Sequence, residues 1–213
     1  MSYSEHGEDT WAVAQFPPGF VGWAAEVGAH DGVTLSNTKL LEDAGWTVLC
    51  IEPNPGVTLN LKEQRKTVWV GACSDRNDAA PFYVYRPEPT WSSLHRTLVY
   101  RSEPTCSSLD RGMLPTSGGQ NPPDAWDEIV VPVHKLGYLL LKYGFPQLDL
   151  LSVDTEGTEL DVLKGIDLER WKPRAIICES WATENPIVDY LAAREYERVG
   201  RLNVNDLFIR KAT

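Results

Sequence analysis

Residues 23–32 read WAAEVGAHDG, a short apolar run that ends in a turn with two glycines. A run of this length, bounded by Gly and Asp, is typical of a buried strand, and the leucines of residues 33–45 then share a helical face. The same succession of apolar run and helical pattern begins again at residues 47–52 and 148–154. Strand, helix and strand in repetition predict a parallel sheet with helices on both of its faces.

We therefore expect residues 1–213 to form a single domain of the α/β class, with a three-layer, Rossmann-like architecture. Further apolar runs predict strands at residues 67–73, 79–85, 174–180, 196–202 and 206–210. The last two of these are expected to form an antiparallel pair at the C-terminal edge of the sheet. Asn54 and Pro55 have the residue types of a helix N-cap and of a first helical position, so a helix is expected to begin there.

Residues 86–128 interrupt this pattern and are rich in Pro, Ser, Thr and Gly. They contain EPTWSSLHR at 88–96 and EPTCSSLDR at 103–111, which agree at seven of nine positions. A connection this long inside a domain is usually either disordered or functional, and we interpret it as a loop or lid insertion. His95 lies in the first copy, where a closing lid would bring a general base to an acceptor. An exposed loop histidine is the simpler alternative.

Twenty Lys and Arg against thirty Asp and Glu give the chain a formal net charge of −10. Nonspecific nucleic-acid binding and attachment to anionic lipid both rely on a basic face, so neither partner is expected. No run approaches the roughly 20 apolar residues of a membrane span, and the first residues lack the apolar core of a signal peptide. The four cysteines form no CxxC pair. We therefore expect reduced thiols and a cytoplasmic location.

Ligands of an open parallel sheet bind beyond the carboxyl ends of its strands, so the residues there carry the functional prediction. Gly28 and Gly32 let the first turn pass close to a ligand, with His30 between them. Glu52 ends the next strand, where a carboxylate can accept hydrogen bonds from both hydroxyls of a ribose, and Pro53 holds it extended. A dinucleotide fingerprint needs three glycines, of which this turn has one in register. That mismatch argues against the alternative ligand, a nicotinamide cofactor.

Asp154 and Glu156 are two residues apart at the end of a strand, so both carboxylates leave it on one face. Acids this close repel one another, so one has a raised pKa, or the two share a proton or a cation. They are suited to take the proton of an alcohol acceptor. Alternatively, Asp154 only orients the cofactor and Glu156 caps the next helix. His30 is left open between a cofactor contact, a base and a packing role. No metal ligands are assigned, and a divalent cation is allowed for but not expected.

Four segments in order resemble the FkbM family of S-adenosylmethionine-dependent methyltransferases: YSEHGED (3–9), EVGAHDG with SNTKLLE (26–32 and 36–42), CIEPNP (50–55) and LSVDTEGTELDVLKG (151–165). The resemblance implies a seven-stranded sheet and methyl transfer, typically to a hydroxyl of a sugar or natural product. It also implies that Glu26, Gly28 and Gly32 frame the methionine part of the cofactor. Glu52 would then take the ribose, with Ser74 and Asp75 near the adenine. Glu5 stands where the family often has Gln, which leaves an amide contact there in doubt.

The sequence thus predicts an S-adenosylmethionine-dependent O-methyltransferase that acts on a small hydroxyl-bearing acceptor. The expected catalytic residues are Asp154, Glu156 and His95. The expected cofactor-binding residues are Glu26, Gly28, His30, Asp31, Gly32, Asn37, Glu52, Pro53, Ser74, Asp75 and Asp154. The alternatives are a nicotinamide-dependent oxidoreductase on the same sheet and a cofactor-binding partner subunit without catalysis. A homo-oligomer is left open.

Overall fold

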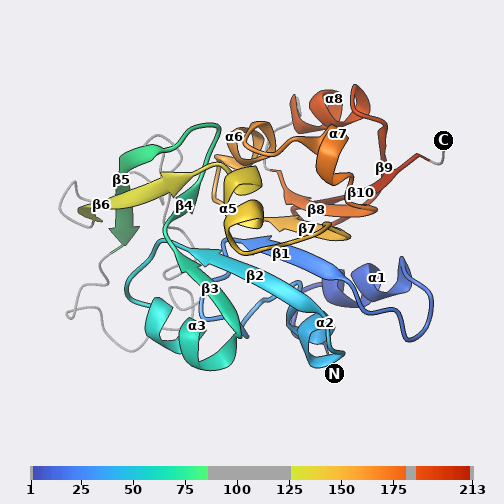
Figure 1. The fold of residues 1–213 in the computed structure, drawn as a ribbon, viewed down its shortest axis with the longest axis horizontal. Helices are drawn as coiled ribbons and strands as arrows, with labels where there is room; N and C mark the ends of the chain where they lie inside the picture. The colour runs from blue at the N-terminus through green and yellow to red at the C-terminus, as the bar shows by residue number, and fades with distance from the viewer. Residues whose placement is uncertain (1, 86–125, 181–185, 212–213) are drawn as a thin grey trace.

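The computed structural model describes residues 2–85, 126–180 and 186–211, and its largest element is a seven-stranded sheet (Figure 1). The strands lie in the order β3 (Thr67–Val70), β2 (Thr47–Glu52), β1 (Trp23–Val27), β7 (Leu150–Val153), β8 (Ala175–Glu179), β10 (Asn205–Arg210) and β9 (Tyr196–Leu202). Neighbours from β3 to β8 run parallel, whereas β10 is antiparallel to both β8 and β9. The predicted mostly parallel sheet with an antiparallel C-terminal pair is confirmed.

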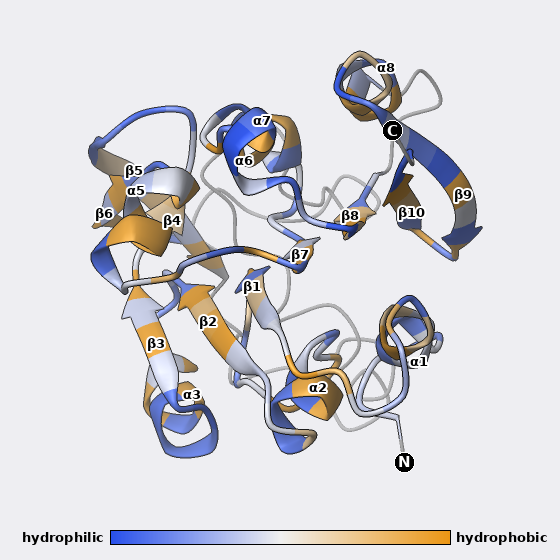
Figure 2. Ribbon diagram, turned by 45° about the vertical axis from the view of Figure 1, so that its right-hand side comes forward, coloured by the Kyte–Doolittle hydropathy of each residue, from blue (hydrophilic) through white to orange (hydrophobic). Residues whose placement is uncertain are grey.

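Helices cover both faces of this sheet, which gives the three layers seen in Figure 2. One face carries α1 (Glu8–Ala14), α2 (Lys39–Asp43) and α3 (Thr58–Gln64). The other carries α5 (Leu136–Lys142), α6 (Glu159–Lys164), α7 (Leu168–Trp171) and α8 (Pro186–Ala192).

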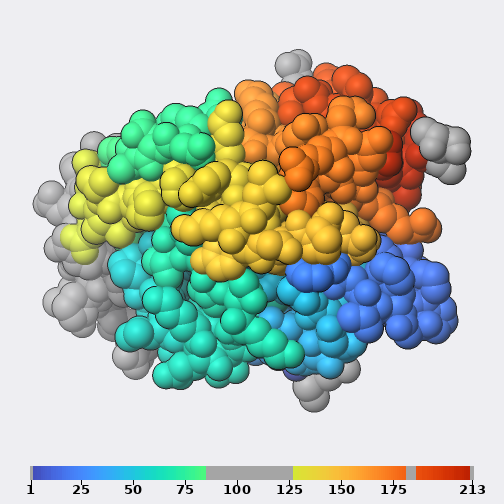
Figure 3. All heavy atoms as spheres, in the orientation of Figure 1, coloured from blue at the N-terminus to red at the C-terminus, as the bar shows by residue number. Residues whose placement is uncertain are grey.

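Each face of the large sheet has its own apolar core, because successive side chains of a strand point to opposite faces of the sheet. The neighbours Ala24 and Ala25 accordingly belong to different cores. Leu41 and Leu61 are buried in the core beneath α1, α2 and α3, and Leu139 is buried in the core on the opposite face. Burying one such side chain contributes about 1.5–3 kcal/mol. The space-filling view shows side chains closing the gaps between the elements on one face (Figure 3).

A second, three-stranded sheet adjoins the first and was not predicted. It consists of β4 (Ala72–Cys73), β6 (Trp126–His134) and β5 (Asp78–Tyr85), in that order. The run 67–73, expected as one strand, divides at Gly71 into β3 of the large sheet and β4 of the small one. Gly71 has a φ of 151°, and a Cβ there would lie 2.6 Å from the carbonyl oxygen of Pro132. The chain therefore changes sheets where only glycine fits.

Two further expectations need correction. The irregular segment expected at 86–128 ends earlier, because β6 begins at Trp126 and pairs antiparallel with β5. The remainder of that segment, with the duplicated motif and His95, lies outside the described residues. The helix expected to begin at Asn54 and Pro55 begins instead at Thr58. The Asn54 side chain accepts a hydrogen bond from the N–H of Gly56 at 2.9 Å and so holds a turn.

Three of the four cysteines, Cys50, Cys73 and Cys178, are buried free thiols, and Cys106 lies outside the described residues. Burial raises the pKa of all three described thiols, which keeps them protonated. Among the described residues, no helix has the length and apolar character that crossing a bilayer would require.

Candidate active site

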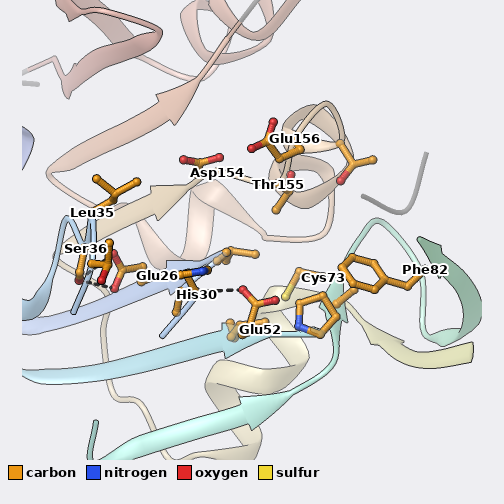
Figure 4. A pocket seen from close by; sticks show the side chains of 18 residues that line it. Glu26, His30, Leu35, Ser36, Glu52, Cys73, Phe82, Asp154, Thr155 and Glu156 are labelled. Atoms are coloured by element: carbon orange, nitrogen blue, oxygen red, sulfur yellow. Dashed lines mark hydrogen bonds between the residues drawn. The ribbon is translucent and has the colours of Figure 1, made fainter. Parts of the chain in front are cut away.

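A pocket opens where the carboxyl ends of β1, β2 and β7 meet the small sheet. It holds about 790 Å³ of space not filled by atoms, part of it open to solvent. Figure 4 shows Glu52 and His30 on one side of it and Asp154 and Glu156 on the other. Its lining comprises Glu26, Val27, Gly28, Ala29, His30, Thr34, Leu35, Ser36, Ile51, Glu52, Pro53, Ala72, Cys73, Phe82, Asp154, Thr155, Glu156 and Thr158. The residues that end the central strands therefore share one pocket.

The turn after β1 is built around Gly28, whose φ of +86° lies in the left-handed region. A Cβ at this position would lie 1.7 Å from the carbonyl oxygen of Asp154, at the end of β7. The N–H groups of Gly28 and Ala29 both donate to the carbonyl oxygen of Ile51, each at 3.0 Å. Gly28 thus lets the end of β1 fit closely between β2 and β7 at the pocket floor.

Glu52 is buried at the end of β2, with both carboxylate oxygens anchored by backbone groups. Its Oε2 accepts a hydrogen bond from the N–H of His30 at 2.9 Å, and its Oε1 accepts one from the N–H of Asn54 at 2.8 Å. Burial raises the pKa of Glu52 to about 7, although these two hydrogen bonds oppose the rise. A carboxylate oxygen has a further lone pair, so each can still accept a hydrogen bond from a ligand hydroxyl.

Glu26 lies at the same edge, but its carboxylate is already engaged inside the protein. It accepts hydrogen bonds from the hydroxyls of Ser36 and Thr38, the latter at 2.6 Å, and from the N–H of Asn37 at 2.7 Å. The buried Arg65 adds an ion pair at 3.0 Å. Glu26 therefore holds the loop between β1 and α2 in place, and through it one wall of the pocket.

Arg65, at the end of α3, was not anticipated from the sequence. Its guanidinium group is fully buried and pairs with Glu26 and with Glu42 of α2, each at 3.0 Å. It also donates to the carbonyl oxygen of Gly32 at 3.1 Å. The side chain thereby ties α3, α2 and the glycine turn together. In the sequence Arg65 stands between Gln64 and Lys66, and no pattern there marks it as buried.

Asp154 and Glu156 follow β7 and are joined by Glu179 from the end of β8. One oxygen atom from each of the three carboxyl groups lies within 4.8 Å of the others. Burial and neighbouring carboxylates raise the pKa of Asp154 to about 6, that of Glu156 to about 8 and that of Glu179 to about 11. A side-chain hydrogen bond links Asp154 and Glu179. This acidic cluster, Asp154, Glu156 and Glu179, therefore holds protons near neutral pH.

The loop that presents Glu156 is fixed by Glu159 of α6. Its Oε1 accepts hydrogen bonds from the N–H groups of Thr155 and Gly157, each at 2.9 Å. Glu156 itself has a φ of +56°, and the pocket residues His30 and Leu35 also have positive φ. Non-glycine residues in this region are costly, and they concentrate at ligand sites where the surrounding structure enforces them.

Of the remaining sequence-predicted residues, His30 and Pro53 line the pocket and the others lie around it. Asp31 accepts hydrogen bonds from the N–H groups of Val33 and Thr34 and so closes a turn. Asn37 is buried and donates to Ser152 at 3.1 Å. Gly32 packs against Arg65, Ser74 is buried, and Asp75 is half exposed beside Arg76. Both ring nitrogens of His30 lack a hydrogen-bond partner among the described residues.

A seven-stranded sheet in this order, with the pocket at the carboxyl ends of its central strands, defines the class of Rossmann-like methyltransferase folds. The Methyltransferase FkbM domain matches residues 26–198, and the chain belongs to this family. A segment of 39 residues is 51% identical to Methyltransferase sdnD of Sordaria araneosa. That match covers 18% of this chain and 15% of the relative, so it spans only a small part of either protein. Family membership supports methyl transfer as the chemistry and an enzyme as the class.

Proposed function

We propose that this chain is an S-adenosylmethionine-dependent O-methyltransferase that acts on a hydroxyl of a sugar or small natural product. The observation that carries the proposal is Glu52, whose buried carboxylate is held by two backbone N–H groups beside the Gly28 turn. This placement at the end of β2 suits the two hydroxyls of a ribose. S-adenosylmethionine is the usual cofactor of this family.

The residues present fit this cofactor. The pocket is open to solvent and lies at the carboxyl ends of the central strands, where open parallel sheets bind small-molecule ligands. Glu52 would hold the ribose, and the Gly28 turn would let the methionine part approach the ends of β1 and β7. When bound, S-adenosylmethionine supplies a methyl group on a positively charged sulfur. The carboxylate of Asp154, across the pocket from Glu52, favours a cationic ligand over an anionic one.

The acidic cluster also gives the acceptor a place to lose its proton. A neutral hydroxyl is a weak nucleophile and needs a base within hydrogen-bond reach. Glu156 lines the pocket, and its pKa of about 8 places its proton exchange close to neutral pH, where a general base is most effective. Asp154, with a pKa of about 6, is the more strongly ionised neighbour. These two carboxyl groups are therefore proposed to receive the hydroxyl proton.

Calorimetry with S-adenosylmethionine and S-adenosylhomocysteine tests the cofactor, and the Glu52→Gln variant tests the assignment of the ribose acid. A hydrogen bond to a charged group contributes about 1.5–3 kcal/mol, so we expect Glu52→Gln to bind roughly ten- to a hundredfold more weakly. Glu63→Gln, an exposed glutamate of α3, is the matched control and should bind as the unmodified chain does. The proposal fails if neither compound binds at high micromolar concentration.

Binding alone would also suit a partner subunit without catalysis, so turnover needs its own measurement. Incubation with S-adenosylmethionine and a panel of sugars and polyols, followed by mass spectrometry of the acceptors, should show transfer of one methyl group to oxygen. Strong cofactor binding with no methylated product over a broad panel would favour the partner subunit instead.

A further inference from the structure

The acidic cluster has the dimensions of a cation site. Its three ligand oxygens, one each from Asp154, Glu156 and Glu179, lie within 4.8 Å of one another. Oxygen ligands bind Mg²⁺ or Ca²⁺ at roughly 2.0–2.6 Å, so two ligands of one ion are at most about 5 Å apart. All three side chains can therefore contact a single ion without rearrangement of the strands that carry them.

The cluster, in which Glu179 is buried and Asp154 and Glu156 are half-buried, also differs from the buried acids elsewhere in the described part of the chain, each of which has a compensating partner. The partners are Arg65 for Glu26 and Glu42, Arg198 for Asp206, backbone N–H groups for Glu52 and Glu159, a backbone N–H and the Asn205 amide for Glu8, and a backbone N–H with serine hydroxyls for Asp9. Among the ion pairs between described residues, none includes Asp154, Glu156 or Glu179. The arginine that balances Glu26, Glu42 or Asp206 therefore has no counterpart here among the described residues.

Glu179 provides an independent sign of a missing ligand. It is only 3% exposed, and its Oε2 has no hydrogen-bond partner within the described part of the chain. A buried polar atom without a partner costs about 1–3 kcal/mol, and such atoms are rare unless a water, an ion or a ligand completes the site. This buried oxygen belongs to the residue that closes the cluster from β8.

We propose that Asp154, Glu156 and Glu179 bind one divalent cation at the carboxyl ends of β7 and β8. Three carboxylate ligands favour a hard ion such as Mg²⁺, Mn²⁺ or Ca²⁺ over Zn²⁺ or Cu²⁺, which prefer nitrogen and sulfur. Three protein ligands leave coordination positions for water or for a further oxygen ligand. The sequence alone pairs Asp154 with Glu156 and allows for a shared cation, but it does not place Glu179 beside them.

The position of the site suggests what the ion would do, and this step rests on the proposed function. Asp154 and Glu156 line the pocket, so an ion bound between them would face it. An acceptor hydroxyl could occupy an open coordination position, where the cation lowers its pKa and orients it. This would favour acceptors that offer two adjacent oxygen atoms, because these can chelate the ion.

Metal binding is tested on the full chain after removal of metal with a chelator. Titration with Mn²⁺, followed by electron paramagnetic resonance at mildly alkaline pH, should show one saturable site, for which Mg²⁺ or Ca²⁺ competes. Removing one carboxylate ligand in Glu179→Gln should weaken binding on the order of tenfold or more. Glu156→Gln, on the loop after β7, should weaken binding in the same way and replaces the Glu179 variant if that variant does not fold. The control Glu63→Gln should bind Mn²⁺ as the unmodified chain does. Folding of each variant is checked by thermal unfolding.

Two results would overturn the proposal: no saturable Mn²⁺ site up to about millimolar concentration, or undiminished binding in folded Glu179→Gln and Glu156→Gln. Binding of S-adenosylhomocysteine, measured on the same samples, separates this proposal from the proposed function. Cofactor binding without Mn²⁺ binding removes only the cation site. Mn²⁺ binding without cofactor binding removes only the methyltransferase proposal.

Discussion

Three glutamates at the carboxyl ends of β1, β2 and β8 show how the same side chain takes different roles. Glu26 is neutralised by Arg65 and Glu52 is anchored by two backbone N–H groups. Glu179 keeps one buried oxygen without a hydrogen-bond partner among the residues that the structure describes. A carboxylate that is already fully paired can support a site but has little left to offer a ligand. All three lie at strand ends, so their position does not distinguish them. Glu26 differs from Glu52 and Glu179 because it has less hydrogen-bonding capacity left for a ligand.

At this scale we predict that Arg65→Met destabilises the chain by about 3–5 kcal/mol, because it leaves Glu26 and Glu42 buried without a counter-charge. Urea denaturation measures this loss. Arg76→Met is the control: Arg76 is exposed and pairs loosely with Asp75 at 3.6 Å, so we expect a change below about 1 kcal/mol. Equal losses in the two variants would show that the buried network does not stabilise the fold.

The sequence predicts site residues where a strand end fixes them, and it fails where a partner arrives from elsewhere. Glu52, Asp154 and Glu156 were chosen because they follow apolar runs, and all three line the pocket. Arg65 could not be found in this way, because it reaches the site from the end of a polar helix. Glu179 also ends an apolar run, but its approach to Asp154 depends on the pairing of β7 with β8.

At the scale of elements, the contact of the β1 turn with β7 is the tightest constraint on the site. We predict that Gly28→Ala costs about 3 kcal/mol or more, since the new Cβ meets a backbone oxygen that can move only if β7 shifts. Gly144→Ala is the matched control, because Gly144 also has a positive φ, of +72°, but nothing lies within 4 Å of the added Cβ.

The control Gly144→Ala should lose only about 1–2 kcal/mol of stability, which is the cost of a left-handed backbone at a residue other than glycine. Chemical denaturation of both variants gives the two values. If Gly28→Ala is no less stable than Gly144→Ala, then the close approach of the two strands does not constrain the fold.

The elements that the sequence missed share a physical cause. Period and apolarity identify residues 67–73 as extended, but they do not reveal that the two halves pair in different sheets. That choice depends on Gly71 and on β6, a partner more than fifty residues further along the chain. Asn54 has the residue type of a helix cap, but its side chain serves a turn that supports the backbone beside Glu52. Residue type alone does not distinguish these two uses.

For the molecule as a whole, the raised pKa values set the dependence of stability on pH. Glu52, Asp154 and Glu156 have pKa values of about 7, 6 and 8, and each is above the ordinary range near 4. Between the ordinary pKa of a carboxyl group and these raised values, the folded chain therefore binds more protons than the unfolded chain. Stability then falls as pH rises, because the folded state must give up these protons in a buried setting.

We predict that the metal-free chain is more stable near pH 5 than near pH 8 by several kcal/mol, because each unit of raised pKa costs about 1.4 kcal/mol once the group must ionise, and three such groups contribute. The acids with lowered pKa, Asp9, Asp31 and Asp43, do not reverse this trend, because they are ionised in both states over that interval. Urea denaturation at a series of pH values in chelator measures the slope. Glu156→Gln should flatten it and Glu63→Gln should not; a stability that rises with pH in the unmodified chain would contradict the prediction.

The global architecture was the most predictable level, because the large sheet follows from apolar runs that alternate with helical segments along the whole chain. The family assignment rests on motifs at the ends of those same runs and is confirmed by the match over residues 26–198. The small sheet and the acidic cluster were less predictable, since each is assembled from segments distant in sequence. Their formation depends on tertiary pairing rather than on local pattern.

The position of β10 has a consequence for how the protein is made. This strand follows β9 in the chain but lies between β8 and β9 in the sheet. While the chain emerges from the ribosome, β1, β2, β7 and β8 can pair as soon as they are available, but the free edge of β8 has no neighbour until β10 has been translated. An open edge beside apolar strands is where nascent chains associate wrongly. A chaperone acting during synthesis would therefore have most effect in the interval between β8 and β10.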